Sequence, residues 1–464
     1  MSPERTNQSR LTVLPLCVCL AVCLLISMAW RFIPNPLIMI VIGLVPLAVL
    51  IILRLPFFFV LLFVIFSFFR IHEVFPQIYN FKIPLLLSMA SLGALLWHVG
   101  LTRKVDIYWR PELTLISVFF TLVVVGVILA SSRPVAIEYF KGIYWKIMIM
   151  TFAIAWLSRS EKDFALASRL ITFFGMLVGL VALSNQFNAV GLVEGTRVTI
   201  GRDIGSVLGD PNDLALVLMF PVAFAGSLIM TANVGHWTKL LGGGSVLILF
   251  FAILATQSRG GLLGMIAIFA VYGYRRIHSK ILFITLILIG AGALFIFAGI
   301  SGRASGGAAE AGIDASAMGR LYAWEAAFGM ALHNPLSGVG INNFYSNYYY
   351  YSPHWDGLNH AVHSTWFGVL AETGFLGLLI FIITMTLLIK TARRSLNRIE
   401  QNLNQVNPAV HSAAQAVFAG LVGTIVSATF LTQGFTWPIY ILAALIVAVA
   451  QWCDNNLPET ASVN

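Results

Sequence analysis

The sequence predicts an all-α polytopic membrane protein with about 12–14 transmembrane helices and one long periplasmic loop that contains an amphipathic helix. Of the 464 residues, 59% are hydrophobic and 10% are charged, against about 45–50% and about 25% in a typical soluble domain. Runs such as Leu37–Leu53, Leu55–Phe69 and Ile281–Ile300 approach the ~20 apolar residues that a helix needs to cross ~30 Å of hydrocarbon. This composition excludes a water-soluble globular protein.

Apolar runs separated by polar residues define the predicted spans. We place them at 11–30, 36–53, 55–71, 84–101, 113–130, 143–157, 164–187, 212–231, 238–256, 260–274, 281–300, 361–389, 411–431 and 437–452. Little more than Arg54 separates the second run from the third, so these two form separate spans, a re-entrant pair or a hairpin of different spacing. The first run lacks a small-residue cleavage site, which favours a retained helix over a removed signal peptide.

The positive charges support one orientation. If the N-terminus is cytoplasmic, alternation of the spans places 16 basic residues inside and 10 outside, as the positive-inside rule requires. The net charge of +9 is spread between spans rather than over one face of a folded domain, so we expect no nucleic-acid partner. The four cysteines lie in or beside the first and last spans and indicate neither a disulfide framework nor a metal site.

The chain divides into four regions. These are N-terminal transmembrane helices at 1–190, transmembrane helices with arginine-bearing periplasmic turns at 191–300, a periplasmic loop at 301–360, and C-terminal transmembrane helices at 361–464. The loop opens with the Gly- and Ala-rich segment Ser301–Gly312 and ends in the aromatic stretch Tyr345–Trp355. Between them, Ser316–His333 has apolar residues at helical spacing, which predicts an amphipathic helix along the membrane surface.

Four arginines on the predicted outer side are candidates for binding an anion: Arg197, Arg202, Arg259 and Arg320. A guanidinium grips phosphate through a planar fork of donors. Each arginine also has an explanation that involves no ligand. Arg259 could simply lie at the membrane interface, Arg197 and Arg202 could be solvated at the surface, and Arg320 could pair with Glu325 or with lipid head groups. Asp210 and Asn212, in the loop before the eighth span, are better explained as helix caps than as site residues.

Two histidines precede the twelfth span, His360 and His363. A histidine with a pKa near 6.5 can act as a general base at neutral pH. The pair could instead bind a metal, but no further ligand cluster is visible, so we expect none. Glu372, inside an apolar span, should face the protein interior and pair with Arg259 or another outer arginine. The sequence lacks ATP-binding, zinc-protease and Asp-x-Asp motifs, so chemistry on the outer face needs a substrate that is already activated.

The ordered motifs over about residues 200–390 resemble the O-antigen ligase and polymerase superfamily. They are Gly209–Ala215, Gln257–Gly261, Arg320 with Trp324, His333–Phe344, and His363-Ser364. The resemblance implies a bacterial inner-membrane glycosyltransferase with a periplasmic active site and a donor glycan on undecaprenyl pyrophosphate. Ligases pass the glycan to the lipid A-core oligosaccharide, and polymerases pass it to another lipid-linked repeat unit.

The same resemblance suggests roles for the candidate residues. It implies His363 as the general base and Arg259 and Arg320 on the pyrophosphate, while Ser364 stands where an Asn often follows the histidine. We expect a metal-independent, cofactor-free single displacement with inversion, because no carboxylate nucleophile is evident. The other candidates are Arg197 and Arg202 for pyrophosphate binding, and Glu372, His360 and Trp324 as supporting residues.

We favour an O-antigen ligase acting among membrane lipids. A lipid-linked repeat-unit polymerase is the second choice, and a protein O-oligosaccharyltransferase of the same superfamily is the third. From another class, the chain could be a transporter for anions such as bicarbonate. That alternative is weak because only Lys146, Arg169 and Glu372 are candidates for ionisable residues deep in the spans.

Overall fold

The computed structural model describes residues 20–297 and 315–458, apart from 22, 29 and 32–34. Throughout these residues the chain forms helices joined by loops, without a β-strand. The prediction of an all-α polytopic membrane protein is therefore confirmed. Most of the first predicted span and all of Ser301–Gly312 lie outside the described residues.

The helices follow the apolar runs of the sequence. They are α2 (Pro36–Arg54), α3 (Pro56–Phe68), α4 (Ile71–Val74), η1 (Pro76–Phe81), α5 (Ile83–Leu96), η2 (Trp97–Leu101), α6 (Pro111–Leu129), α7 (Arg133–Tyr139), η3 (Phe140–Tyr144), α8 (Trp145–Leu157), α9 (Glu161–Phe187), η4 (Val207–Gly209), α10 (Pro211–Met230), α11 (His236–Thr256), α12 (Arg259–Arg276), α13 (Lys280–Phe297), α14 (Ala315–His333), α15 (Phe344–Tyr351), α16 (Thr365–Gln401), α17 (Pro408–Ala428) and α18 (Trp437–Asn456).

Nine helical segments in the described part of the chain are long and apolar enough to cross a membrane. They are Gln77–Leu101, Pro111–Leu129, Arg133–Leu157, Glu161–Phe187, Pro211–Met230, His236–Thr256, Thr365–Gln401, Pro408–Ala428 and Trp437–Asn456. The pair at Arg54 is bent by 95°, so it is a broken span or a re-entrant loop. Helix α12 forms where a span was predicted but falls outside the nine, since it begins at Arg259 and ends with Arg275 and Arg276.

Helix α10 lies at the centre of the bundle. It packs against α9, α11, α12 and α17, and its side chains are buried on all sides. Small residues allow this close packing: Gly261 of α12 lies against Ala215 of α10, and Gly242 of α11 lies against the Ala225 carbonyl. Close approach at small residues is the usual way in which helices associate within a membrane.

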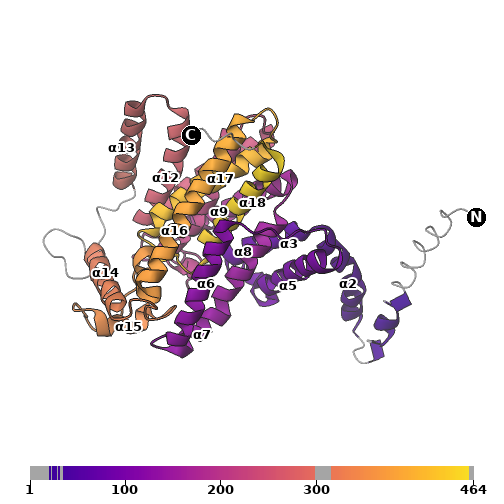
Figure 1. Cartoon of the computed structure of the whole chain (residues 1–464), viewed down its shortest axis with the longest axis horizontal. Helices are drawn as coiled ribbons and strands as arrows, with labels where there is room; N and C mark the ends of the chain where they lie inside the picture. Colours follow the sequence, from indigo (N-terminus) through magenta and orange to yellow (C-terminus); the bar gives the residue numbers. More distant parts are fainter. Residues whose placement is uncertain (1–19, 22, 29, 32–34, 298–314, 459–464) are drawn as a thin grey trace, which may run out of the picture.

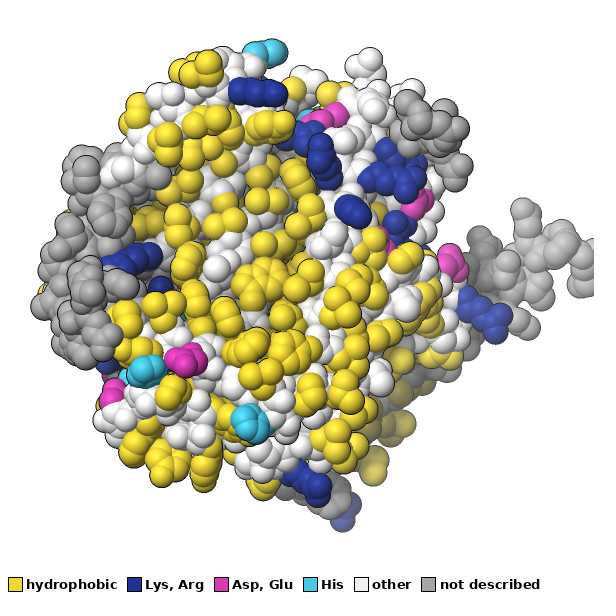
Figure 2. All heavy atoms as spheres, turned by 60° about the vertical axis from the view of Figure 1, so that its left-hand side comes forward, with side chains coloured by type: hydrophobic (Ala, Val, Ile, Leu, Met, Phe, Trp, Pro, Cys, Tyr) yellow, Lys and Arg dark blue, Asp and Glu magenta, His cyan; other side chains and the backbone are white. Residues whose placement is uncertain are grey.

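The bundle has two ends (Figure 1). We call one the His363 end, where α10, α12 and α16 begin and where α14 and α15 lie, and the other the Arg398 end, where α12 and α16 end. At the Arg398 end, Arg398 and Arg110 both donate to Asp454, and Arg275 donates to Glu400. Figure 2 shows hydrophobic side chains over the middle of one face, with Lys and Arg gathered toward its upper edge. This distribution suits a bilayer-spanning bundle.

Helix α14 forms where the amphipathic helix was predicted, but it packs against α15 and α16. Its buried face carries small residues and a methionine, including Ala323, Ala327 and Met330. Leu321 and Phe328, which belong to the same predicted apolar stripe, remain about half exposed, at 46% and 47%. The apolar residues of this helix are therefore shared between a protein contact and the outer surface.

Candidate functional site

The N-terminus of α10 is held against the turn between α11 and α12. Asp210 caps α10, since its carboxylate accepts the N–H groups of Asn212 (2.7 Å) and Asp213 (3.3 Å). The Asn212 side-chain oxygen accepts from the Arg197 guanidinium (3.1 Å) and from the Ser258 hydroxyl (2.9 Å). The capping prediction is confirmed for Asp210 and wrong for Asn212, whose side chain instead joins two loops.

Arg197 is a buried member of this unit, 7% exposed. Its Nε donates to the carbonyl oxygen of Thr256 (3.1 Å), the last residue of α11. Ser258 then caps α12 by accepting the N–H of Gly261 (3.3 Å), so that Arg259 is the first residue of α12. The Arg197 side chain is thereby fixed by hydrogen bonds, and the backbone of Arg259 is placed next to the same unit by the Ser258 cap.

The turn between α17 and α18 joins this unit to the start of α16. Gly260 of α12 lies tightly against Leu431. The Leu431 carbonyl accepts the hydroxyl of Thr365, the first residue of α16, at 2.6 Å. His363, two residues before α16, is therefore carried to the same end of the bundle as Arg259.

His363 is half-buried and adopts a left-handed backbone conformation, with φ 43°. This conformation is uncommon outside glycine, costs about 1–3 kcal/mol, and clusters at functional sites. Burial lowers the pKa of the imidazole below its ordinary value of 6.5, and Arg320 lowers it further. Asp210 raises the pKa, while His360 and Arg197 lower it, each by less. The imidazole is therefore neutral at pH 7 and can accept a proton.

Trp324 connects α14 to the histidine segment. Its indole N–H donates to the carbonyl of Val362 (3.1 Å), and its ring stacks on Phe367 with centroids 5.0 Å apart. Arg320 lies one helical turn before Trp324, which explains why its charge acts on His363. A supporting role for Trp324 thus has a geometric basis.

Glu372 has different neighbours from those that we expected. Its carboxylate, buried in α16, accepts the backbone N–H of Phe344 (3.2 Å) and is also hydrogen-bonded by the backbone at Asn342. The expectation was a partner such as Arg259. Instead, Glu372 sits at the N-terminus of α15, where unsatisfied N–H groups and the helix dipole favour a carboxylate.

Residues 334–340, which follow α14, are hydrogen-bonded to α16 at the point where that helix is interrupted. At Gly374 the backbone is not helical (φ 71°, ψ −173°), which frees the N–H of Phe375 to donate to the Pro335 carbonyl at 2.8 Å. In the other direction, Val339 donates to the Ala371 carbonyl at 2.8 Å. A Cβ atom at Gly374 would overlap the Pro335 backbone. This segment therefore fastens α14 and α15 to α16.

Two predicted candidates lie at the exposed edge. Arg202 is exposed, and its backbone lies against Gly209. His360 pairs with Asp356 at 2.9 Å, and this hydrogen bond lowers the pKa of the Asp356 carboxyl. His360 is close enough to influence His363 electrostatically, but its own imidazole is already engaged by a carboxylate.

Two polar groups near the histidine, Ser364 and Asp210, have properties that the sequence did not predict. The Ser364 hydroxyl is buried, with the residue 1% exposed, and has no hydrogen-bond partner among the described residues. Buried polar groups are nearly always hydrogen-bonded, so this hydroxyl is an exception among the buried groups at this end of the bundle. Asp210 acts on His363 as well as capping α10. No spacing rule signals either property, because each depends on which distant segment lies nearby.

The arrangement places a neutral base within the electrostatic reach of two guanidinium groups, those of Arg320 and Arg197. Such a site can take a proton from a hydroxyl while it stabilises charge on a phosphorylated leaving group. Within the described ranges, no three His, Cys, Asp or Glu side chains lie close enough to hold a metal ion.

Comparison with known families places most of these residues in one segment. Residues 244–382 match the O-antigen ligase family model, which confirms the resemblance seen in the motifs. The matched segment includes Arg259, Arg320 and His363, whereas Arg197 and Arg202 lie before it. No curated protein matches the chain.

Proposed function

We propose, on the premise that residues 244–382 form an O-antigen ligase domain, that this chain is a membrane glycosyltransferase of the ligase type. Its donor is a glycan on undecaprenyl pyrophosphate, and its acceptor is the lipid A-core oligosaccharide. The reaction takes place on the periplasmic face of the bacterial inner membrane. The observation that carries this proposal is the neutral His363 imidazole in the electrostatic field of Arg320 and Arg197, within or beside the matched segment.

The chemistry is a single displacement at C1 of the donor sugar. An acceptor hydroxyl forms the new C1–O bond while its proton goes to the His363 imidazole. The bond from C1 to the pyrophosphate breaks, and the electron pair leaves with the undecaprenyl pyrophosphate. Arg259 and Arg320 bind the phosphate oxygens on which charge grows, and Arg197 and Arg202 add positive charge around them. Attack opposite the leaving group inverts the configuration, and no metal or cofactor takes part.

The supporting residues act on the position of these groups. Trp324 holds the backbone next to His363, and Glu372 holds the N-terminus of α15. His360 is the alternative base, although it is paired with Asp356.

The lipopolysaccharide ladder of a strain that lacks this protein tests the proposal. Loss of a ligase leaves only the lipid A-core band and accumulates lipid-linked polymer. A band of core plus one repeat would identify a repeat-unit polymerase instead. An unchanged ladder with loss of glycan from proteins would identify a protein O-oligosaccharyltransferase, and an unchanged ladder with altered bicarbonate uptake would identify a transporter.

A further inference from the structure

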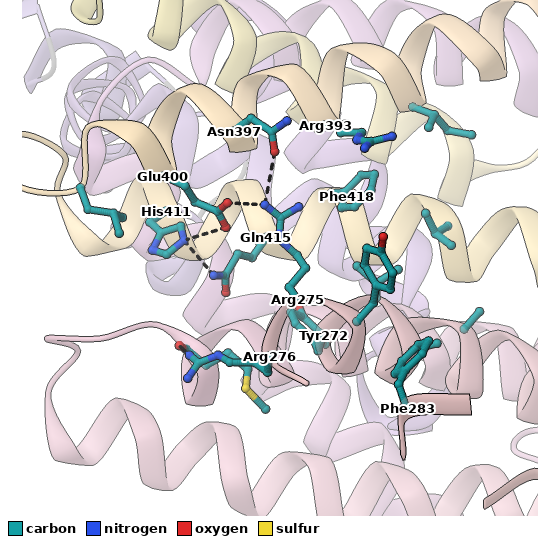
Figure 3. Close-up of a pocket in the computed structure, with 18 residues that line it drawn as sticks. Tyr272, Arg275, Arg276, Phe283, Arg393, Asn397, Glu400, His411, Gln415 and Phe418 are labelled. Atoms are coloured by element: carbon teal, nitrogen blue, oxygen red, sulfur yellow. Dashed lines mark hydrogen bonds and ion pairs between the residues drawn. The ribbon is translucent and has the colours of Figure 1, made fainter. Parts of the chain in front are cut away.

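A cavity of about 970 Å³ lies at the Arg398 end, away from the candidate active site. It is bounded by α12, α13, α16 and α17 (Figure 3). Apolar side chains from all four helices line it: Tyr272 on α12, Phe283 on α13, Ile389 on α16, and Phe418 and Val422 on α17. This wall suits a hydrocarbon chain rather than a water-soluble molecule.

A polar network stands beside the apolar wall. Arg275 donates to the carboxylate of Glu400 and to the side-chain oxygen of Asn397 (3.3 Å). The Nε2 atom of His411 lies 3.8 Å from a carboxylate oxygen of Glu400 and is hydrogen-bonded to the side-chain nitrogen of Gln415 at 2.8 Å. Figure 3 shows these side chains meeting between α12, α16 and α17. The network holds the Arg275 guanidinium in place and offsets its charge.

Two further arginines belong to the cavity wall, Arg276 on α12 and Arg393 on α16. One nitrogen of the Arg276 guanidinium donates a hydrogen bond to the carbonyl oxygen of Met230. Arg393 is exposed and forms no hydrogen bond or ion pair with a described residue. With three arginines and a single glutamate in the wall, positive charge is in excess, so the cavity combines an apolar interior with a cationic rim.

We propose that this cavity binds an anionic phospholipid, with its phosphate at Arg393, further positive charge from Arg276 elsewhere on the rim, and an acyl chain against Phe283 and Phe418. The ligand must be amphiphilic because the wall combines apolar side chains with arginines. It must be anionic because the arginines give the rim a positive charge. The cavity lies at the ends of membrane-spanning helices, which is the depth at which lipid head groups occur, and basic pockets between such helices bind anionic head groups. This inference does not depend on the glycosyltransferase proposal.

Lipid titration of the purified full-length protein in detergent tests the head-group contact. We expect phosphatidylglycerol to bind in native mass spectra and to raise the melting temperature, whereas phosphatidylcholine with the same acyl chains binds at least about tenfold more weakly. The double variant Arg276→Gln/Arg393→Gln should lose about tenfold in affinity for phosphatidylglycerol. Arg394→Gln is the matched control, since Arg394 is exposed on the same helix but absent from the cavity wall, and it should bind normally.

A second variant tests the acyl-chain contact. Ala270 lines the cavity and is only partly buried, so Ala270→Phe should fill the apolar part and weaken phosphatidylglycerol binding while leaving elution in detergent unchanged. Equal binding of the two lipids, or unchanged affinity in the double arginine variant, would overturn the proposal. An equal melting shift with inorganic phosphate alone would also overturn it, because the site would then take a free anion.

Discussion

The two ends of the bundle both contain buried arginines but surround them differently. At the Arg398 end, Arg398 donates to the carboxylate of Asp454 as well as to backbone carbonyls. At the His363 end, Arg197 donates to the carbonyl of Thr256 and to the side-chain oxygen of Asn212. A carboxylate cancels most of the field of a guanidinium at the Arg398 end, whereas the charge of Arg197 acts on the His363 imidazole.

The histidines of the two ends differ in the same way. His363 is acted on by Arg320 and Arg197, which favour its neutral form, whereas His411 at the other end lies beside Glu400. The contrast teaches that one residue type can stabilise a helix end or prepare a reactive site, according to its neighbours. It follows that substitutions at the His363 end should reduce transfer, and those at the Arg398 end should reduce stability.

The largest expected effect is on the activity of a fused reporter enzyme, which should be present or absent according to which end of the bundle faces the periplasm. A periplasm-specific reporter such as alkaline phosphatase should be active when fused at Gly307, in the predicted periplasmic loop, because the basic residues favour a cytoplasmic N-terminus. The same reporter fused at Asn404, between α16 and α17, should be inactive. The reverse pattern would place the candidate site in the cytoplasm and remove the proposed reaction.

Replacement of the base should have the next largest effect. His363→Ala should reduce transfer by about 10²–10⁴-fold, the usual contribution of a general base. Donor binding should persist, because the arginines proposed to bind the pyrophosphate are unchanged. The measurement is turnover of purified enzyme with lipid-linked donor and acceptor, with His360→Ala as the comparison. If His360→Ala is the more damaging change, the base is His360.

The arginines should not tolerate lysine. Arg259→Lys and Arg320→Lys should each lower transfer by about 10–100-fold, because lysine keeps the charge but cannot form a bidentate fork. Arg275→Lys at the Arg398 end is the control and should transfer normally once folded. Rates near wild type in both site variants, at matched expression, would contradict the role on pyrophosphate.

The pH dependence of the transfer rate should change when a charged residue near His363 is replaced. Because the pKa of His363 is lowered, transfer should be level near pH 7 and decline only as acid protonates the imidazole. Arg320→Gln removes a charge that lowers the pKa, so the decline should begin at higher pH. Asp210→Asn removes a charge that raises it, so the decline should begin at lower pH, and asparagine still caps α10. If the transfer rate declines over the same acidic pH range in all three proteins, His363 is not the titrating group. Added chelator should not change any of these rates.

The smallest effect on transfer is expected at the opposite end. Arg398→Met should cost about 1–3 kcal/mol of stability, since it removes charge-assisted hydrogen bonds to Asp454 and to carbonyls. Thermal melting in detergent gives the loss, and turnover per folded molecule should match wild type. A selective loss of turnover without a melting shift would show that the division between the two ends is wrong.

Several parts of this protein could be predicted from local sequence. Hydropathy predicted the helices, and cap chemistry predicted the start of α10 at Asp210. The motifs singled out Arg320 and His363, which the structure brings within electrostatic reach of one another. These signals are readable because span length, capping and turn formation depend on residues only a few positions apart.

Other features were decided by packing between segments far apart in the chain. The break at Gly374 and the position of Glu372 at the N-terminus of α15 depend on which surfaces meet. The same holds for the burial of Ser364. A carboxylate in an apolar span must find donors, and the sequence determines that need, but only the tertiary structure decides that a helix N-terminus meets it instead of an arginine.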